Sequence, residues 1–255
     1  MRVALTFLEQ ILTSRREAVE RLKRSSFPVG PPIRDFRGAL GAEGISLIAE
    51  IKRASPSRGD LNADLDPATL AKAYEDGGAR ALSILMEPEF FKGSADDLIA
   101  ARGAGHQLPV LWKDFVIDSA QVDAARSAGA DAVLVIVRIL KDTELNDLVE
   151  RVHATAMCAL VEVFDERDLE RALRAGATVI GVNHRDLETF EEDPTATKRL
   201  RPLVPDDVVL VAESAISSRS DVAELEAIGV DAVLVGETLV TAGDPEAKIR
   251  ELLGA

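Results

Sequence analysis

The sequence has 255 residues, of which 47% are hydrophobic and 29% are charged, proportions that are typical of a soluble globular protein. Its 30 Lys and Arg residues are outnumbered by 44 Asp and Glu residues, and the net charge of −14 makes nucleic acid and anionic membranes poor partners. Cys158 is the only cysteine, and no apolar stretch approaches the ~20 residues of a membrane span, so we expect a cytoplasmic protein without disulfides.

The first predicted element is a helix over Leu5–Lys23, in which apolar residues recur at near-helical spacing. Three prolines then break the chain at Pro28, Pro31 and Pro32. With the linker that follows, this helix forms an N-terminal extension over residues 1–44.

Eight short apolar runs come next, and each is followed by a helical pattern. Four of the eight begin just after a glycine, at Gly78, Gly129, Gly176 and Gly229, a position that predicts a left-handed helix C-cap before a buried strand. In chain order the runs lie in 45–51, 78–84, 109–112, 129–135, 159–163, 176–182, 208–212 and 229–235, and the last predicted helix covers Pro245–Leu253.

Eight strand–helix alternations in about 210 residues predict a closed (βα)₈ barrel over residues 45–255, within one domain that spans 1–255. The structural alternative is a doubly wound open sheet, which the absence of a G-x-G-x-x-G after any strand disfavours. We expect the N-terminal helix to cap one mouth of the barrel, with ordinary packing against its side as the alternative.

Polar residues gather where the predicted strands end, which is the end at which barrel enzymes place their active sites. A lysine at this end can act as a general acid, and a carboxylate can act as a base or hold the lysine in place. Side-chain alternation then points Trp112 outward if Lys113 points inward. The residues concerned are Glu50, Lys52, Lys113, Glu162, Asn183, Arg185, Glu213, Ser214 and Glu237.

The histidines and the cysteine do not predict a metal site, because none of them is clustered at zinc-ligand spacing. We expect His106 and His153 at the surface near helix ends, His184 pointing away from the cavity, and Cys158 buried as a structural thiol. The loops after the last two strands, 214–216 and 236–238, carry small residues that let the backbone approach a phosphate.

These residues stand in segments that together resemble one family. The segment Ile48–Gly59 (IAEIKRASPSRG) is the most specific, and the others follow in the family's order: Phe90–Ser94, Lys113–Phe115, Leu160–Val163, Gly181–Leu187 and Ala212–Ser214. Together they resemble indole-3-glycerol-phosphate synthase from about residue 5 to the end of the chain.

The resemblance implies ring closure, decarboxylation and dehydration of 1-(2-carboxyphenylamino)-1-deoxyribulose 5-phosphate in tryptophan biosynthesis, without metal or organic cofactor. It implies that Lys113 is the general acid, that Glu162 is the base in dehydration, and that Lys52 assists proton transfer and anion binding. The other implied catalytic residues are Glu50 and Asn183, which position the lysine and substrate, and Glu213 and Ser214, which bind hydroxyls.

The resemblance also implies a substrate-binding set. In it, Arg185 binds the anthranilate carboxylate, and Lys52, Lys113 and Arg185 form the basic island that an acidic protein needs for an anionic substrate. The remaining members are Ser55 and Pro56, the apolar wall of Phe91, Leu134 and Leu187, and the phosphate-binding backbone of Ala215, Gly236 and Glu237. Ala215 replaces the family's usual glycine and adds a methyl group beside the phosphate.

Two other functions remain open. A phosphoribosylanthranilate isomerase would need a Cys/Asp pair at the ends of the first and fourth strands, where this chain has Glu50 with Lys52 and Val137 with Arg138. A non-catalytic sensor or scaffold for phosphorylated ligands would bind without turnover. It would also be expected to lose members of the lysine–carboxylate set, all of which this chain retains. Oligomeric state and association with other enzymes of the pathway leave no signal in the sequence.

Overall fold

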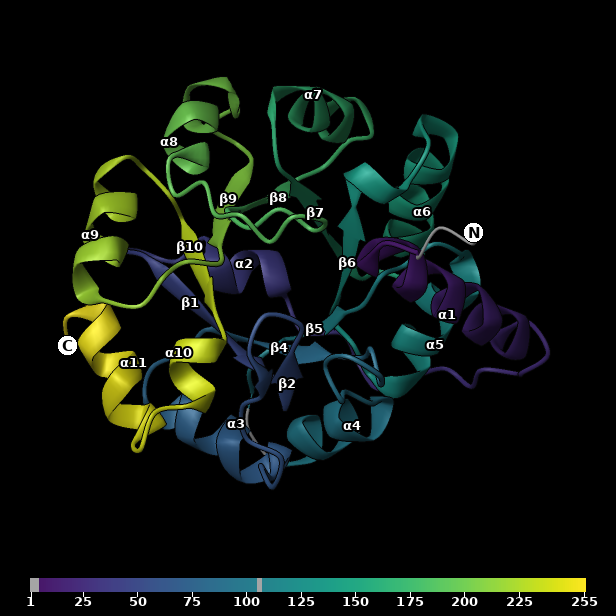
Figure 1. The fold of residues 1–255 in the computed structure, drawn as a ribbon, viewed down its shortest axis with the longest axis horizontal. Coiled ribbons are helices and arrows are strands. Elements are labelled where there is room, and N and C mark those ends of the chain that lie inside the picture. Colours follow the sequence, from purple (N-terminus) through teal and green to yellow (C-terminus); the bar gives the residue numbers. More distant parts are fainter. Residues whose placement is uncertain (1–4, 105–106) are drawn as a thin grey trace.

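The computed structural model describes residues 5–104 and 107–255. In this part of the chain, eight parallel strands close into a barrel in the order β1-β10-β9-β8-β7-β6-β5-β4, with helices around it (Figure 1). The strands are β1 (Ser46–Ile51), β4 (Ala81–Leu85), β5 (Val110–Lys113), β6 (Ala132–Ile136), β7 (Cys158–Val163), β8 (Val179–Asn183), β9 (Val209–Glu213) and β10 (Ala232–Val235). The predicted closed barrel is confirmed, and the open sheet is wrong.

Most of the outer helices begin at side-chain caps, and many end before glycines. Asp66, Asp118 and Asp165, for example, each accept a hydrogen bond from a backbone N–H in the first turn of the following helix. The four predicted cap glycines all have φ between 81° and 101°, a left-handed conformation that side chains disfavour. These helices are α3 (Pro67–Asp76), α4 (Ala95–Gly103), α5 (Ser119–Ala128), α6 (Asp142–Ala154), α7 (Glu166–Arg174), α8 (Ala196–Leu200), α9 (Arg219–Ala227) and α11 (Pro245–Leu253).

Short elements complete the loops at the strand ends. An antiparallel pair, β2 (Ala54–Ser55) and β3 (Gly59–Asp60), follows β1, and a one-turn helix, α10 (Glu237–Val240), follows β10. Two 3₁₀ turns, η1 (Val137–Ile139) and η2 (Arg201–Leu203), follow β6 and α8. In the described part of the chain, no helix is long and apolar enough to cross a membrane.

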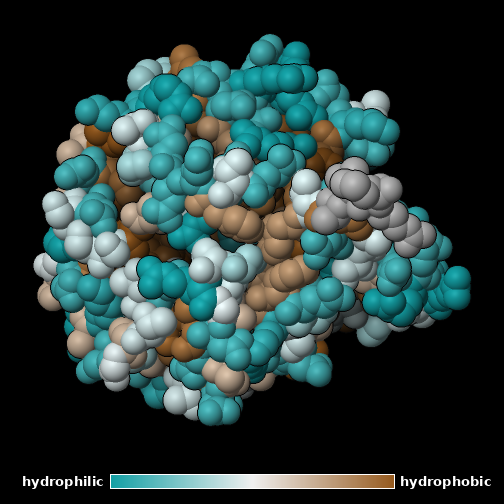
Figure 2. All heavy atoms as spheres, viewed as in Figure 1, coloured by the Kyte–Doolittle hydropathy of each residue, from teal (hydrophilic) through white to brown (hydrophobic). Residues whose placement is uncertain are grey.

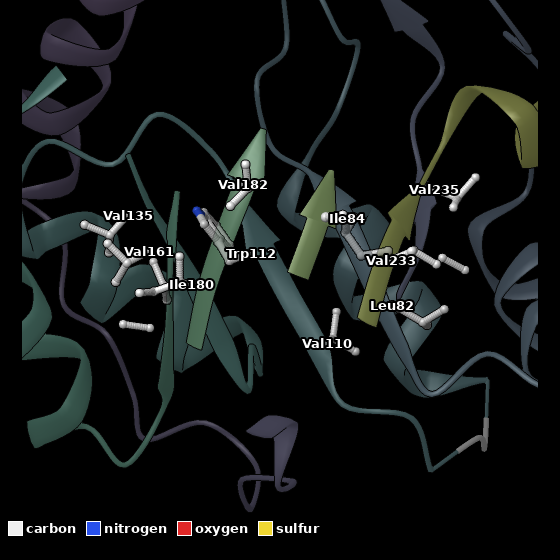
Figure 3. Close-up of a cluster of buried hydrophobic side chains, with 14 of the residues drawn as sticks. Leu82, Ile84, Val110, Trp112, Val135, Val161, Ile180, Val182, Val233 and Val235 are labelled. Atoms are coloured by element: carbon white, nitrogen blue, oxygen red, sulfur yellow. The ribbon is translucent and has the colours of Figure 1, made fainter. Parts of the chain in front are cut away.

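Two apolar layers hold the barrel together. Outward side chains such as Ile84, Trp112 and Val161 pack between the strands and the helices (Figure 3). Inward side chains such as Leu111 and Leu160 fill the interior of the barrel. Trp112 is 6% exposed within the outer layer, so the prediction that it points toward the helices is confirmed.

The predicted N-terminal helix is α1 (Phe7–Leu22), which begins at a capping box between Thr6 and Glu9. It lies beside α5 on the flank of the barrel (Figure 1). Its buried face includes Ile11 and Arg15, and only its first turn, at Phe7, reaches the cavity described below. The helix therefore borders one mouth of the barrel instead of covering it.

The opposite mouth is filled by α2 (Phe36–Leu40), a helix that the sequence interpretation missed. Phe36 and Leu40 are 1% and 0% exposed, and they share an apolar cluster with Ala81, Val179 and other residues at the starts of strands. Asp35 caps this helix, and the Ser46 hydroxyl donates to the Leu40 carbonyl at 3.0 Å. The N-terminal end of the barrel is thus closed by apolar packing.

Candidate active site

A cavity of about 360 Å³ opens at the C-terminal ends of the strands. Apolar surface shows near the middle of this face, ringed by hydrophilic side chains (Figure 2). All sixteen residues predicted for the site line this one cavity: Glu50, Lys52, Ser55, Pro56, Phe91, Lys113, Leu134, Glu162, Asn183, Arg185, Leu187, Glu213, Ser214, Ala215, Gly236 and Glu237. The structure brings the set together, whereas the role of each member stays a prediction.

Lys113, at the end of β5, lies among three buried carboxylates. Its Nζ is 2.9 Å from Glu213 Oε2, 3.8 Å from Glu162 Oε2 and 3.9 Å from Glu50 Oε2. The three carboxylate residues are only 1–3% exposed. Lys52 forms a second pair with Glu50, at 2.7 Å between Nζ and Oε1. The nearest partner of Lys113 is therefore Glu213, while Glu50 is closest to Lys52.

These groups differ in how readily they hold a proton. Burial and the adjacent Glu213 raise the pKa of Glu162 to about 8, although Lys113 opposes the shift. Burial would also raise the pKa of Glu50, but the Lys52 and Lys113 ammonium groups reverse the effect and lower it. Burial would lower the pKa of Lys113, but its three carboxylate neighbours, Glu213 first, raise it instead. The cluster thus combines a charged lysine with a carboxyl group that titrates close to neutrality.

Two glycines make room for these charges. A side chain at Gly181 in β8 would place its Cβ 2.1 Å from Glu213 Oε1. At Gly236, just after β10, a Cβ would lie 2.3 Å from Glu50 Oε1 and 3.0 Å from Lys52 Nζ. The two distances to carboxylate oxygens are shorter than any real Cβ contact, so any other residue at either position would displace the charged groups.

Asn183 is the last residue of β8, Arg185 lies two residues further along the chain, and both line the cavity. The Asn183 Oδ1 accepts from the Ser214 hydroxyl at 2.8 Å and from the Arg185 backbone N–H at 3.0 Å. The Arg185 guanidinium donates through Nε to Glu192 at 3.1 Å and through Nη1 to the Ser57 hydroxyl at 3.2 Å. Arg185 therefore connects the loop after β8 with the loop after β1.

The predicted phosphate loops, which follow β9 and β10, also line the cavity. Ser214 and Ala215 have φ values of 68° and 55°, so two successive residues are left-handed without being glycine. The Thr238 hydroxyl donates to the Ile216 carbonyl at 2.9 Å and joins the two loops. Arg58, which had no predicted role, forms an ion pair with Glu237 at 2.9 Å.

The expectation of a basic island is wrong for the cavity as a whole. Carboxylates outnumber cations among the described residues that line it. The cations are Lys52, Arg58, Lys113 and Arg185, and the carboxylates are Glu50, Asp114, Glu162, Asp186, Glu192, Glu213 and Glu237. The sequence analysis included Glu50, Glu162, Glu213 and Glu237 in the site, but the cavity is also lined by Asp114, Asp186 and Glu192. A phosphate here would depend on backbone N–H groups more than on net positive charge.

The apolar wall contains more residues than the three that were predicted. Phe115, Phe7 and Phe190 also line the cavity. The Phe7 ring packs edge-on against Phe90 and Phe190, with centroids 4.8 Å and 5.0 Å apart. Phe115 stood in the Lys-Asp-Phe segment and could have been included, but nothing local in the sequence joins residue 7 to residue 190.

Residues predicted to lie elsewhere are placed as follows. His184 is buried and hydrogen-bonded to the Thr197 hydroxyl at 2.6 Å, away from the cavity lining, as predicted. His153 is exposed near the end of α6, also as predicted. His106 lies outside the described residues. Cys158 is half-buried at the start of β7, less enclosed than expected, and burial raises the pKa of its thiol to about 12.

The fold and the site together define an enzyme of the (βα)₈-barrel class, with a lysine and carboxylates converging at the catalytic end of the barrel. The described residues include no group of three His, Cys, Asp or Glu side chains arranged to hold a metal ion. The chain matches the model of the indole-3-glycerol phosphate synthase family over residues 8–252 and belongs to that family. It is therefore a carboxy-lyase of tryptophan biosynthesis.

Relatives of known name agree with the family model. The chain is 49% identical over 239 residues to indole-3-glycerol phosphate synthase of Mycolicibacterium vanbaalenii, covering 94% of this chain and 86% of that protein. It is 52% identical over 224 residues to indole-3-glycerol phosphate synthase 2 of Streptomyces coelicolor, covering 88% and 86%. The alignments span most of each protein.

Solved structures of low sequence identity share the fold alone. A 3-hexulose-6-phosphate synthase from Salmonella typhimurium superposes with a TM-score of 0.67 at 13% identity, covering 82% of this chain and 97% of that one. An N-acetylmannosamine-6-phosphate 2-epimerase from Clostridium perfringens gives 0.64 at 14% identity, covering 87% and 97%.

Proposed function

We propose that this chain converts 1-(2-carboxyphenylamino)-1-deoxyribulose 5-phosphate into indole-3-glycerol phosphate, carbon dioxide and water, with the site residues acting as outlined below. The observation that carries the assignment of roles is the position of Lys113, whose ammonium group lies within 3.9 Å of three buried carboxylates at the cavity floor. An ammonium held in this way can deliver a proton to an oxygen that becomes negative during the reaction.

Ring closure begins when the aromatic carbon that bears the carboxylate attacks the substrate carbonyl carbon. Negative charge develops on the carbonyl oxygen, and Lys113 protonates it. The carboxylate then leaves as carbon dioxide and the ring regains its aromaticity. Glu213, at 2.9 Å from Lys113, and Glu50 keep the lysine protonated and oriented for this step.

Dehydration follows, because the hydroxyl group formed in ring closure must leave as water. Glu162 takes the proton from the neighbouring carbon, and its pKa of about 8 suits a base that works near neutral pH. Lys52, paired with Glu50 at 2.7 Å, assists the proton transfer to the departing oxygen and balances the charge of the substrate.

Binding is divided among the loops that surround the cavity. Arg185 holds the anthranilate carboxylate, and Phe91, Leu134 and Leu187 enclose its ring, with Ser55 and Pro56 above them. Ser214, Glu213 and Asn183 bind the substrate hydroxyls. The backbone N–H groups of Ala215, Gly236 and Glu237 hold the phosphate, where two left-handed residues form a concave turn.

The N-terminal extension, 1–44, belongs to the same working unit as the barrel, 45–255. Phe7 lines the cavity, and the Arg15 guanidinium lies 3.3 Å from Asp114, the residue after Lys113. We infer that the protein works in the cytoplasm, where its phosphorylated substrate would be found. Neither nucleic acid nor membrane enters this reaction.

The direct test is to incubate the purified protein with the anthranilate deoxyribulose phosphate and follow indole fluorescence. The expected result is an increase in fluorescence matched by the release of one carbon dioxide per product. Binding of the substrate without fluorescence or carbon dioxide would favour the sensor alternative. Turnover of phosphoribosylanthranilate in place of this substrate would favour the isomerase.

A further inference from the structure

Arg185 already has a carboxylate partner within the chain. Its Nε donates to Glu192 Oε1 at 3.1 Å, and its Nη2 donates to the same oxygen. Its Nη1 donates to the Ser57 hydroxyl at 3.2 Å. Glu192 also lines the cavity, and its side chain is 42% exposed. None of the roles given above explains why a glutamate should face the arginine that binds the substrate.

The backbone fixes this glutamate opposite the arginine. Residues 185 and 192 face each other in an antiparallel bridge. The Asp193 N–H donates to the His184 carbonyl at 2.7 Å, and the Asp186 N–H donates to the Glu191 carbonyl at 2.9 Å. Arg138 holds the loop from outside, with 2.7 Å between its Nη1 and the Asp186 carboxylate. The Arg185–Glu192 pair therefore lies in a short hairpin whose backbone hydrogen bonds hold the two residues opposite each other.

The contacts of the guanidinium leave room for a second carboxylate. An arginine has five N–H donors in a planar fork. Glu192 engages Nε and one N–H of Nη2, and Ser57 engages one N–H of Nη1. One donor on Nη1 and one on Nη2 remain available to a carboxylate. Glu192 thus holds one edge of the guanidinium without using all of its donors.

We propose that Glu192 is a positioning residue for substrate recognition: it orients the Arg185 guanidinium so that its free donors meet the carboxylate of the substrate. This inference rests on the proposed function, which gives Arg185 that ligand. Orientation outweighs repulsion between the two carboxylates, because Glu192 is partly exposed and its charge is screened by solvent. A long arginine without this partner would lose rotamer freedom on binding, and affinity would fall.

The test compares two ligands that differ in the carboxylate. One is a substrate analogue with its ketone reduced to an alcohol, which keeps the carboxylate and cannot cyclise. The other is the product, indole-3-glycerol phosphate, which has lost the carboxylate. We expect Glu192→Ala to weaken the analogue about 5–20-fold, within the range of a charge-assisted hydrogen bond, and to change product binding less than about twofold.

Two further variants separate orientation from charge. Glu192→Gln keeps an oxygen that accepts from Nε and Nη2, so we expect it to recover most of the affinity for the analogue. Glu191→Gln removes the same charge from the exposed neighbouring residue and should leave both affinities unchanged. In turnover, Glu192→Ala should raise KM for the substrate and leave kcat within about twofold, since the carboxylate is still attached, and is held alike, in the ground state and in the transition state of ring closure.

Three outcomes would overturn the proposal. Tighter binding of the analogue to Glu192→Ala would mean that Glu192 competes with the ligand. Equal weakening of analogue and product would mean that Glu192 only maintains the loop. An Arg185→Ala variant that binds the analogue normally would remove the arginine, and with it Glu192, from recognition. Failure of the proposed function appears separately, as wild-type protein that binds both ligands but does not release carbon dioxide.

Discussion

The two ends of the barrel interior are built from the same strands in opposite ways. We call the N-terminal end of the strands, which α2 closes, the lower end, and the C-terminal end, which carries the cavity, the upper end. On β1, β7 and β9 the inward side chain nearer the lower end is that of Ile48, Leu160 and Val211, respectively. Two positions further along, where the side chain points the same way, the residue is Glu50, Glu162 or Glu213. On β5 the corresponding change is from Leu111 to Lys113. A step of two residues along each strand therefore separates an apolar layer in the barrel interior from the charged residues at the base of the cavity.

This difference separates what stabilises the barrel from what works in it. The lower end is apolar and buried, closed by Phe36 and Leu40 of α2. The upper end buries three carboxylates, and Glu162 Oε1 and Glu213 Oε1 accept no hydrogen bond from the described residues. Buried polar atoms without partners are destabilising, so the lower end must supply the stability that the upper end gives up.

The largest expected effect is the loss of Lys113 at the upper end. Lys113→Met keeps the approximate length of the side chain but removes the proton, so we expect kcat to fall by ~10²–10⁴-fold. The protein should stay folded, since the buried carboxylates can take up protons when the ammonium is absent. Lys113→Arg should rescue poorly, because guanidinium holds its proton too tightly. Near-normal kcat in folded Lys113→Met would transfer the acid role to Lys52.

The matching change at the lower end is Phe36→Ala. Removing this ring from a fully buried site should lower the free energy of unfolding by ~3–5 kcal/mol, measured by denaturant titration. The kcat of the folded fraction should remain normal, because α2 lies at the opposite end from the cavity. Phe36→Leu, a milder change, serves if the alanine variant does not fold. A selective loss of kcat in either variant would contradict the division between the two ends.

The pH dependence of the upper end follows from Glu162. Burial and Glu213 raise its pKa to about 8, and a general base must be ionised, so activity should rise with pH. We expect kcat/KM to increase about tenfold per unit up to that pH and then level off. Glu213→Gln removes a neighbouring negative charge and should move the rising part of this pH profile to lower pH. A profile that stays in place would show that another group is titrating.

The sequence allowed more of the upper end to be predicted than of the lower end. Strand ends are marked by an apolar run that stops at a charged residue, which is how Lys113 and Glu213 were found. The sequence could not show that Glu213 is the nearest partner of Lys113, because that depends on the stagger between strands that are distant in the sequence. The helix α2, which closes the lower end, has only five residues, too few for a periodic pattern. The contact of Phe7 with Phe190 joins positions far apart in the sequence and leaves no local signal.

At the rim of the upper end the effect should be smaller and confined to binding. Arg185→Ala removes the charged partner of the substrate carboxylate, and a bidentate charged contact is worth roughly 1.5–3 kcal/mol, so kcat/KM should fall by ~10–150-fold. Most of the loss should appear as a higher KM. Steady-state kinetics with the wild-type protein as reference measure it, and unchanged kinetics would remove Arg185 from the site.

The smallest expected effect comes from a pair of alanines with the same backbone strain at opposite ends. Ala215, after β9, has φ 55°, and Ala156, before β7, has φ 62°. A left-handed alanine costs about 1–2 kcal/mol, which glycine relieves, although glycine gives back ~0.4–1 kcal/mol through the unfolded chain. Ala215→Gly and Ala156→Gly should therefore both stabilise the protein slightly.

Only Ala215→Gly should also change function, because its methyl group lies in the loop proposed to hold the phosphate. We expect the KM for the substrate to fall about 2–5-fold, since a backbone without a Cβ lets the N–H groups approach an anion more closely. Ala156→Gly should leave the KM unchanged, since Ala156 precedes β7 at the lower end. Inorganic phosphate, tested as a competitive inhibitor, should tighten in the same ratio as the substrate if the gain arises at the phosphate. A lower KM without tighter phosphate inhibition would assign the gain to the substrate hydroxyls beside Ser214, and an equal change in both variants would attribute it to relief of strain alone.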